Sequence, residues 1–108
     1  MVNKVVLVGR LGADAKKTEI GKDRITKISF SLCTTHYSNK TPVPSWHNCG
    51  LVGKLAESIG QYMTKGKMVY IEGRLSYWKN KEDQIVTEID VQEVKLLEHK
   101  KDDETAAS

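Results

Sequence analysis

The sequence predicts an all-β fold, a β-barrel with one short helix. Five segments of the 108-residue chain are rich in β-branched residues or alternate between apolar and polar side chains, as strands do. Between the third and the fourth segment, the apolar spacing changes to that of an amphipathic helix. Both prolines fall between the second and the third segment, where a loop is expected. A chain of this length can form one domain with its own core.

Three strands are expected before the helix. Residues 2–12, "VNKVVLVGRLG", are β-branched and end at glycine. Residues 12–24 are polar and contain turn residues, which indicates a loop or the start of a hairpin. The second strand is expected over 25–35 and the third over 46–52, with the proline-containing loop 36–45 between them.

The helix is expected where the period changes. Leu55, Ile59, Tyr62 and Met63 lie at i, i+4, i+7 and i+8, which places them on one face of a helix of about three turns. Gly66 follows as a C-terminal stop.

Two strands are expected after the helix, over 67–78 and 85–98, joined by the polar hairpin loop 79–84. In the last strand the apolar residues change face partway along, and a β-bulge near Gln92 would explain the change. The element order β-β-β-α-β-β is that of the OB-fold, a five-stranded, partly open barrel. Residues 1–98 are expected to form this domain, and the polar residues 99–108 a disordered tail.

The composition is that of an ordinary soluble domain, with 39% hydrophobic and 29% charged residues. The formal net charge of +3 permits a polyanionic partner without requiring one. No apolar run approaches the roughly 20 residues that span a bilayer, and the start is too short and too charged for a signal peptide. A cytoplasmic protein with reduced cysteines is therefore expected. Because P-loop, H-E-x-x-H and nucleophile-elbow motifs are absent, we expect neither an enzyme nor a cofactor.

Four segments together resemble one family, the bacterial single-stranded DNA-binding proteins. These are "VNKVVLVGRLG", "SWHNCGLVGKLAE", "YMTKGKMVYIEGRL" and "TEIDVQEVKLL", in the same order and with similar spacing over residues 2–97. The resemblance implies an OB-fold, usually a homotetramer, that coats single-stranded DNA without sequence preference or catalysis. It also implies a nucleoid-associated role in DNA replication, recombination and repair.

A sequence-independent binder of single strands needs exposed aromatic platforms among cations. Trp46 lies at the position of a stacking tryptophan in the family, on the strand face that also carries Asn48 and Gly50, which are poor core residues. The alternative is a core tryptophan that anchors the barrel. Tyr37 lies near the family's second stacking aromatic residue, and its alternative is a tyrosine that covers the end of the barrel.

Trp78 and Val52 depart from the family's pattern. The family's tryptophan on the fourth strand corresponds to Asn80, and Trp78 lies two residues earlier on the same strand face. Trp78 is therefore expected to stack a base one step along the groove. At Val52 the family commonly has a stacking phenylalanine, so weaker binding or a different path of the strand is expected.

Phosphate contacts and subunit contacts complete the expected site. The expected phosphate contacts are Lys54, Arg74, Lys79, Lys65 and Arg10. Each of these side chains could instead be a solvated surface charge. The resemblance implies that His47 lies against a neighbouring subunit, because alternation turns it away from Trp46, and Tyr70 is expected at the same interface.

A zinc site is the alternative for one group of residues. Cys33, His36, His47 and Cys49 follow the pattern C-x2-H-x10-H-x-C, and zinc favours four such ligands. The second half of the pattern lacks the usual two-residue spacing. We therefore expect no metal, and we expect Cys49 to be buried packing.

The chain ends in "KKDDETAAS". Family members usually continue into a linker and an acidic tip with bulky apolar residues, which recruits replication and repair enzymes. A helicase or polymerase would lack that handle here, so recruitment is not expected; a minimal coating protein and a truncated chain both stay open. The rival function is an OB-fold module for protein interaction, such as a primosome-like accessory factor, or for RNA, with weak binding of single-stranded DNA.

Overall fold

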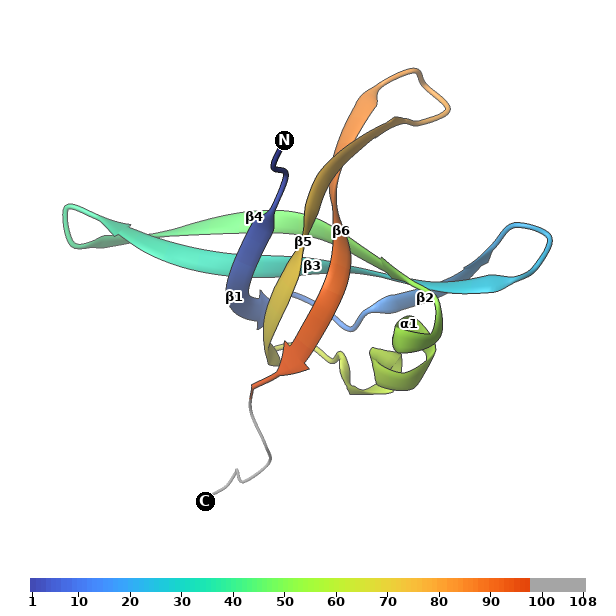
Figure 1. Cartoon of the computed structure of the whole chain (residues 1–108). Helices are drawn as coiled ribbons and strands as arrows, with labels where there is room; N and C mark the ends of the chain where they lie inside the picture. Colours follow the sequence, from blue (N-terminus) through green and yellow to red (C-terminus); the bar gives the residue numbers. More distant parts are fainter. Residues whose placement is uncertain (98–108) are drawn as a thin grey trace.

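The computed structural model describes residues 1–97 (Figure 1). The expected polar tail, residues 99–108, lies outside the described residues. One short helix, α1 (Lys54–Ile59), continues into a 3-10 turn, η1 (Gly60–Tyr62). The strands are β1 (Val5–Leu11), β2 (Lys16–Ile20), β3 (Ile25–Ser38), β4 (Thr41–Val52), β5 (Met68–Lys79) and β6 (Ile85–Leu96).

The strands form one sheet that closes on itself. Their order is β1-β5-β6-β4-β3-β2, and β1 also pairs with β3 through Arg10↔Cys33 and Leu11↔Leu32. The neighbours β4 and β6 run parallel and meet at Cys49↔Ile89. Strands β1, β3, β4, β5 and β6 thus make the closed five-stranded barrel of an OB-fold. The predicted fold class is confirmed.

The segment expected to be a loop, residues 36–45, consists mostly of strand residues instead. Strands β3 and β4 pair as far as Ser38↔Thr41, so the turn between them consists of Asn39 and Lys40, both at positive φ. Pro42 and Pro44 lie within β4, two residues apart, so both ring nitrogens point to the same side of the strand. That arrangement suits an open strand edge, where no N–H is needed. The expected loop 36–45 is therefore wrong.

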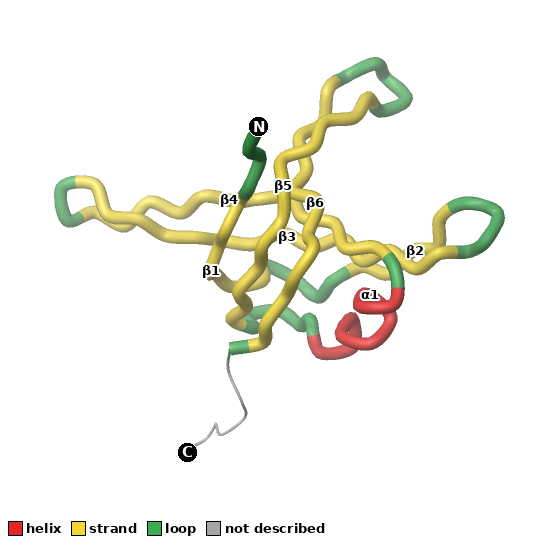
Figure 2. Tube along the Cα trace, in the orientation of Figure 1, coloured by secondary structure: helices red, strands yellow, loops and turns green. Residues whose placement is uncertain are grey.

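The segment 12–24, left open between a loop and a hairpin, contains β2. This strand pairs with β3 from Lys16↔Ser29 to Ile20↔Ile25. Three hairpins consequently project from the barrel, β2–β3, β3–β4 and β5–β6 (Figures 1 and 2).

The core fills the barrel and continues under α1. Met63, just after η1, is buried, and the strand residues Ile28, Leu32, Val69 and Ile71 are almost fully buried. These side chains come from alternate positions of their strands, so the intervening residues face outward.

The bulge at Gln92 is confirmed. Glu72 pairs with Glu93 and Gly73 pairs with Val91, so Gln92 is the extra residue of β6. Gly73 lies against the opposite strand, because a Cβ there would be 2.3 Å from the carbonyl oxygen of Asp90. The bulge explains why the buried parity of β6 changes partway along.

The helix is shorter than its apolar spacing predicts. It ends at Ile59 and tightens into η1, and Tyr62 is exposed rather than packed on the core. Gly66 follows at φ 86°, in the region that favours glycine. Within residues 1–97, no helix is long and apolar enough to cross a membrane.

Candidate nucleic-acid interface

One face of the sheet points away from the core, and we call it the outer face. On β3 and β4 the pairs Ser29↔Gly50 and Ser31↔Asn48 belong to it, whereas the pair between them, Phe30↔Cys49, is buried in the core. By the same alternation, even-numbered residues of β5 lie on the outer face. The face is therefore polar where it crosses β3 and β4.

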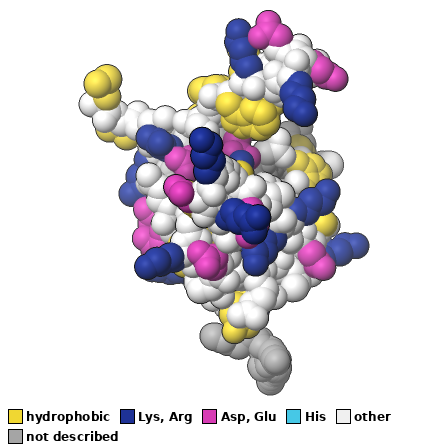
Figure 3. Space-filling view, turned by 90° about the vertical axis from the view of Figure 1, so that its right-hand side faces the viewer, with side chains coloured by type: hydrophobic (Ala, Val, Ile, Leu, Met, Phe, Trp, Pro, Cys, Tyr) yellow, Lys and Arg dark blue, Asp and Glu magenta, His cyan; other side chains and the backbone are white. Residues whose placement is uncertain are grey.

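A pocket of about 310 Å³ lies on this face between the β3–β4 and β5–β6 hairpins. We call it the outer-face pocket. Its lining includes residues from five strands, β2 to β6, and from the loop after β1, among them Trp78, Glu88, Asn48, Ser29, Lys16 and Asp14. In Figure 3, hydrophobic side chains gather just below the charged tip of the uppermost hairpin, β5–β6, and basic and acidic side chains are intermixed over the rest of this view.

Trp46 lies on the outer face of β4, opposite Cys33 of β3. Its side chain is 61% exposed, so it is not a core residue that anchors the barrel. The ring reaches Gly12, where an added Cβ would lie 2.5 Å from ring atom Cζ3. Gly12 therefore leaves room for the ring, and the neighbouring Ala13 lines the outer-face pocket. Trp46 presents an aromatic surface held against the backbone on one side.

Trp78, unlike Trp46, is part of the pocket lining. It lines the outer-face pocket from β5 and is 47% exposed. Asn80, two residues on, shapes the hairpin turn, because its Oδ1 accepts hydrogen bonds from the N–H groups of Glu82 at 2.9 Å and Gln84 at 3.0 Å. That turn role is a physical reason for position 80 to carry an asparagine and not a tryptophan.

Tyr37 lies farther out, at the end of the β3–β4 hairpin. It pairs with Pro42, and its side chain is 71% exposed. Alternation along β3 places Tyr37 on the same strand face as Cys33, and hence as Trp46. It does not cover the end of the barrel, and it lies outside the pocket. Val52 is also on the outer face, where it pairs with Lys27 and exposes 45% of its surface.

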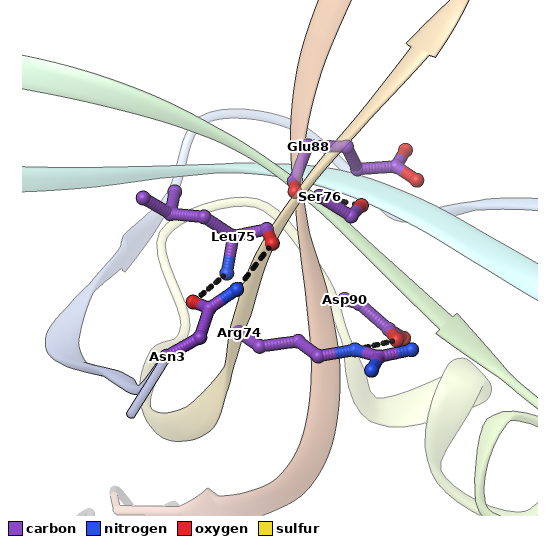
Figure 4. A network of polar contacts seen from close by, with 6 residues as sticks. All are labelled: Asn3, Arg74, Leu75, Ser76, Glu88 and Asp90. Atoms are coloured by element: carbon purple, nitrogen blue, oxygen red, sulfur yellow. Dashed lines mark hydrogen bonds and ion pairs between the residues drawn. The ribbon is translucent and has the colours of Figure 1, made fainter. Parts of the chain in front are cut away.

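The expected phosphate contacts occupy three places. Arg74 shares the outer face of β5 with Trp78, and its Nε donates to Asp90 at 3.0 Å (Figure 4). Lys79 stands at the tip of the same hairpin, 3.4 Å from Asp83. Lys54 is exposed at the first residue of α1, two residues after Val52.

Arg10 and Lys65 come together at the end of β1. The guanidinium of Arg10 donates to the carbonyl oxygen of Gly66 at 3.0 Å. The backbone N–H of Lys65 donates to the Asp14 carboxylate at 2.8 Å, and Asp14 lines the outer-face pocket. Lys65 thus lies beside the rim of the pocket nearest to the loop after β1, whereas Arg10 lines a separate hollow with Val8, Cys33 and Met68.

An ion pair across the outer face was missed by sequence reasoning. The Nζ of Lys27 lies 3.2 Å and 3.4 Å from the two carboxylate oxygens of Glu88, and both side chains are mostly buried. Gly50 lies between them, since a Cβ there would be 3.0 Å from both side chains. The two residues are 61 positions apart, and the parallel contact of β4 with β6 that brings them together leaves no local sequence signal.

The base of the β5–β6 hairpin is tied to the N-terminal segment. The side-chain amide of Asn3 donates to the carbonyl oxygen of Leu75 and accepts from its N–H, both at 2.9 Å (Figure 4). The amide therefore continues the β1–β5 ladder beyond its last pair, Val5↔Gly73. Sequence reasoning gave this residue no role.

The two expected interface residues lie on different faces. His47 is half-buried and faces away from Trp46, as alternation predicts, with Nε2 2.9 Å from the hydroxyl of Thr34. Tyr70 is on the outer face of β5, where its hydroxyl donates to Glu72 at 2.5 Å. This hydrogen bond raises the pKa of Tyr70 to about 12 and lowers the pKa of Glu72.

The cysteines and histidines of the possible zinc pattern are separated. Cys49 is buried in the core, as expected, and burial followed by the charge of Glu88 raises the pKa of its thiol to about 12. Cys33 lies on the opposite face of the same hairpin, and His36 is exposed. Among residues 1–97, no three His, Cys, Asp or Glu side chains come close enough together to hold a metal ion.

Known proteins resemble the chain over nearly all of the described residues. A family model described as "Single-strand binding protein family" matches residues 2–97. The "Single-stranded DNA-binding protein" of Xanthomonas campestris pv. campestris is 41% identical over 83 residues, which cover 72% of this chain and 48% of that protein. The protein of the same name from Xylella fastidiosa strain Temecula1 is 37% identical, covering 89% of this chain and 63% of that protein.

A third relative is closer to this chain in length. "Single-stranded DNA-binding protein 1" of Xylella fastidiosa strain 9a5c is 33% identical over 111 residues, which cover 94% of this chain and 81% of that protein. The chain therefore spans about half to two thirds of the length of the first two relatives and most of the third.

Proposed function

The chain belongs to the single-strand binding protein family, and we propose that it binds single-stranded DNA of any sequence and coats it during replication, recombination and repair. The observation that carries this proposal is the pair of exposed tryptophans on the outer face: Trp78 lines the outer-face pocket, and Trp46 lies against Gly12, next to the pocket-lining Ala13. Each base stacked on an aromatic ring contributes on the order of 1–3 kcal/mol, and every base has a face to stack. Tyr37 extends the same surface along the β3–β4 hairpin.

The phosphates meet cations that surround these rings. Arg74 shares the outer face of β5 with Trp78, and Lys79 follows Trp78 at the hairpin tip with its position on the alternate strand face. Lys65 lies beside Asp14, and Arg10 reaches the neighbouring Gly66. Lys54 lies beyond Val52. The ion pairs of Arg74 and Lys79 are exposed, and exposed pairs contribute only about 0–1 kcal/mol, so phosphate oxygens can compete for both cations.

The binding unit is a homo-oligomer, most simply a tetramer, with His47 and Tyr70 at subunit contacts. Tyr70 pairs with Val8 across β1 and β5, and Val6 lies on the same face. Val6 and Val8 are about half exposed, so this part of the sheet presents an apolar patch beside Tyr70. A second copy that covered it would remove these side chains from water.

The protein acts by binding rather than by catalysis, in the cytoplasm and close to the nucleoid. The candidate site offers stacking surfaces and cations, which hold a strand without making or breaking a covalent bond. Recruitment of replication or repair enzymes is not assigned to the segment 99–108, which has no bulky apolar residue of the kind that family tips carry.

Titration with dT oligonucleotides, followed by tryptophan fluorescence, tests the proposal. We expect strong quenching that weakens as salt is added, because phosphate contacts release counterions. The matched probe is an rU oligonucleotide, which distinguishes DNA from RNA as the preferred strand. Absence of quenching by dT at low salt would contradict the proposal, and tighter binding of rU would favour the RNA-binding alternative.

A further inference from the structure

The outer-face pocket combines an aromatic wall with polar groups. Its volume of about 310 Å³ is at the lower end of the range for small-molecule sites. Trp78 lines it from β5, Asn48 and Ser31 line it from β4 and β3, and Glu88 lines it from β6. An aromatic ring beside hydrogen-bonding groups can hold a base by its face and by its edge at once.

Besides Asp14, whose carboxylate accepts from the N–H of Lys65, Glu88 is the second charged acceptor that lines this pocket. Lys27 holds both of its carboxylate oxygens, at 3.2 Å and 3.4 Å, and the hydroxyl of Ser76 donates to its backbone carbonyl oxygen at 3.1 Å. A carboxylate donates no hydrogen bond and offers about four lone-pair positions. The two contacts of Lys27 therefore leave acceptor capacity on a side chain that is only 17% exposed.

We propose that the outer-face pocket is a base subsite that favours nucleobases with an exocyclic amino group. This inference rests on the proposed binding of single-stranded DNA. Cytosine and adenine present an amino group on the edge where thymine presents the oxygen O4, and carboxylates accept from the N4 amino group of cytosine. That group donates to Glu88 while the base stacks on Trp78.

Thymine fits the same pocket less well. Its O4 meets the Glu88 carboxylate without a hydrogen between the two oxygens, and placing an acceptor against a mostly buried acceptor is unfavourable. The subsite adds a base preference to stacking and phosphate contacts that accept any sequence. DNA of any sequence therefore still binds, but the one nucleotide that occupies this subsite is held more tightly when its base carries an amino group.

Oligonucleotides of dT and of 5-methyl-dC test the subsite, because their bases have the same size and differ only at the N3–C4 edge. Tryptophan fluorescence gives a dissociation constant for each, and the quantity of interest is the ratio of the dT constant to the 5-methyl-dC constant. Intrinsic differences between the two oligonucleotides cancel when this ratio is compared between protein variants. In Glu88→Gln we expect the ratio to fall about threefold to tenfold.

Two further variants make the result specific. Asp90→Asn removes a carboxylate from the same face of β6, but Asp90 does not line the pocket, so both oligonucleotides should bind more tightly at an unchanged ratio. Lys27→Gln leaves the Glu88 carboxylate in place with more free acceptor capacity, so the ratio should be kept or should rise. This variant also decides the matter if Glu88→Gln does not fold.

The outcomes separate the inference from the function on which it rests. If Glu88→Gln binds both oligonucleotides at the wild-type ratio, the subsite is wrong and DNA binding stands. An equal fall of the ratio in Asp90→Asn would also overturn the subsite, since it would reveal a general effect of charge. A fall of the ratio in Lys27→Gln would overturn it as well, because the Glu88 carboxylate is still present in that variant. If the wild-type protein binds neither oligonucleotide, the proposed function itself fails.

Discussion

Trp46 and Trp78 lie on the outer face in two differently supported parts of the sheet. Trp46 lies on β4 beside β3, close to where β3 pairs with β1, and its ring rests on the backbone of Gly12. Trp78 lies near the tip of the β5–β6 hairpin, which leaves the barrel as two strands and is tied at its base by Asn3. Trp46 is therefore a platform fixed by the barrel, whereas Trp78 is carried on the β5–β6 hairpin, which we call the arm.

The difference matters because ordering a mobile group on binding costs free energy. A side chain already held in its bound orientation loses less freedom when a base stacks on it. Trp46 should therefore contribute more to affinity than Trp78, although their rings are equal in size. The following predictions test this comparison, from the largest expected effect to the smallest.

The largest effect is expected at the base of the arm. In Gly73→Ala the added Cβ would lie 2.3 Å from the carbonyl oxygen of Asp90, so the β5–β6 pairing at the bulge must shift. We expect a loss of about 3 kcal/mol in the free energy of unfolding, measured by chemical denaturation.

Gly60→Ala is the matched control for Gly73→Ala. Gly60 has helical φ and ψ, and the nearest atom to an added Cβ there is a side-chain methyl of Ile28 at 3.3 Å. We expect its effect on stability to stay within about 1 kcal/mol. Equal losses in the two variants would show that the bulge has no special role.

Removal of the two platforms should weaken DNA binding unequally. We expect Trp46→Ala to cost about 2–3 kcal/mol of binding free energy and Trp78→Ala about 1 kcal/mol, with little change in melting temperature. Fluorescence anisotropy of a labelled dT oligonucleotide measures the binding free energy of each variant. A sharp fall of the melting temperature in Trp46→Ala would instead indicate a structural role.

Tyr77→Ala is the control for these substitutions. Tyr77 is 65% exposed on the same strand as Trp78, but its position alternates to the opposite face. It should bind DNA as the wild type does. If Tyr77→Ala weakened DNA binding as much as Trp78→Ala does, the DNA would have to contact the Tyr77 face of the β5–β6 hairpin. That result would contradict the placement of the DNA on the outer face.

Loosening the tip of the arm should affect Trp78 alone. Asn80→Ala removes the acceptor that holds the N–H groups of Glu82 and Gln84, so the turn becomes less ordered. We expect affinity to fall by about 0.5–1 kcal/mol, and no further loss when Trp78→Ala is already present. An additive loss in the double variant would show that Asn80 acts independently of Trp78.

The smallest effect concerns a site away from both platforms. The Tyr70 hydrogen bond lowers the pKa of Glu72, so this pair stabilises the fold above the ordinary Glu pKa, and the stabilisation is lost as the pH falls through the folded-state value. The melting temperature of Glu72→Gln should therefore lie slightly below that of the wild type near neutral pH and approach it in acid. A difference that is independent of pH would contradict this assignment.

Much of the fold follows from local patterns in the sequence. Side-chain alternation along β4 predicts that Trp46 and Cys49 lie on opposite faces of the strand. The change to helical spacing marks α1, and the change of buried parity in the last strand locates the extra residue Gln92. Each of these features depends on residues within a few positions of one another. Alternation therefore identifies which side chains leave the core.

The features that sequence reasoning missed depend on distant residues. The prolines of β4 indicate a loop locally, and only an open strand edge on a long hairpin makes them compatible with pairing. The contact of Gly12 with Trp46 requires the closure of β1 on β3. The pair of Lys27 with Glu88 requires the parallel contact of β4 and β6. Recognition of the family located the aromatic residues but not the outer-face pocket, which Trp78 lines.

Single-tryptophan proteins test the central claim most directly. Trp78→Phe leaves Trp46 as the only tryptophan of the chain, and Trp46→Phe leaves only Trp78. If both rings stack bases, a saturating dT oligonucleotide quenches the fluorescence of both variants, and binding is tighter in the protein that keeps Trp46. If either tryptophan keeps its full fluorescence while the oligonucleotide is bound, that ring is not a platform, and the account of the outer face is wrong.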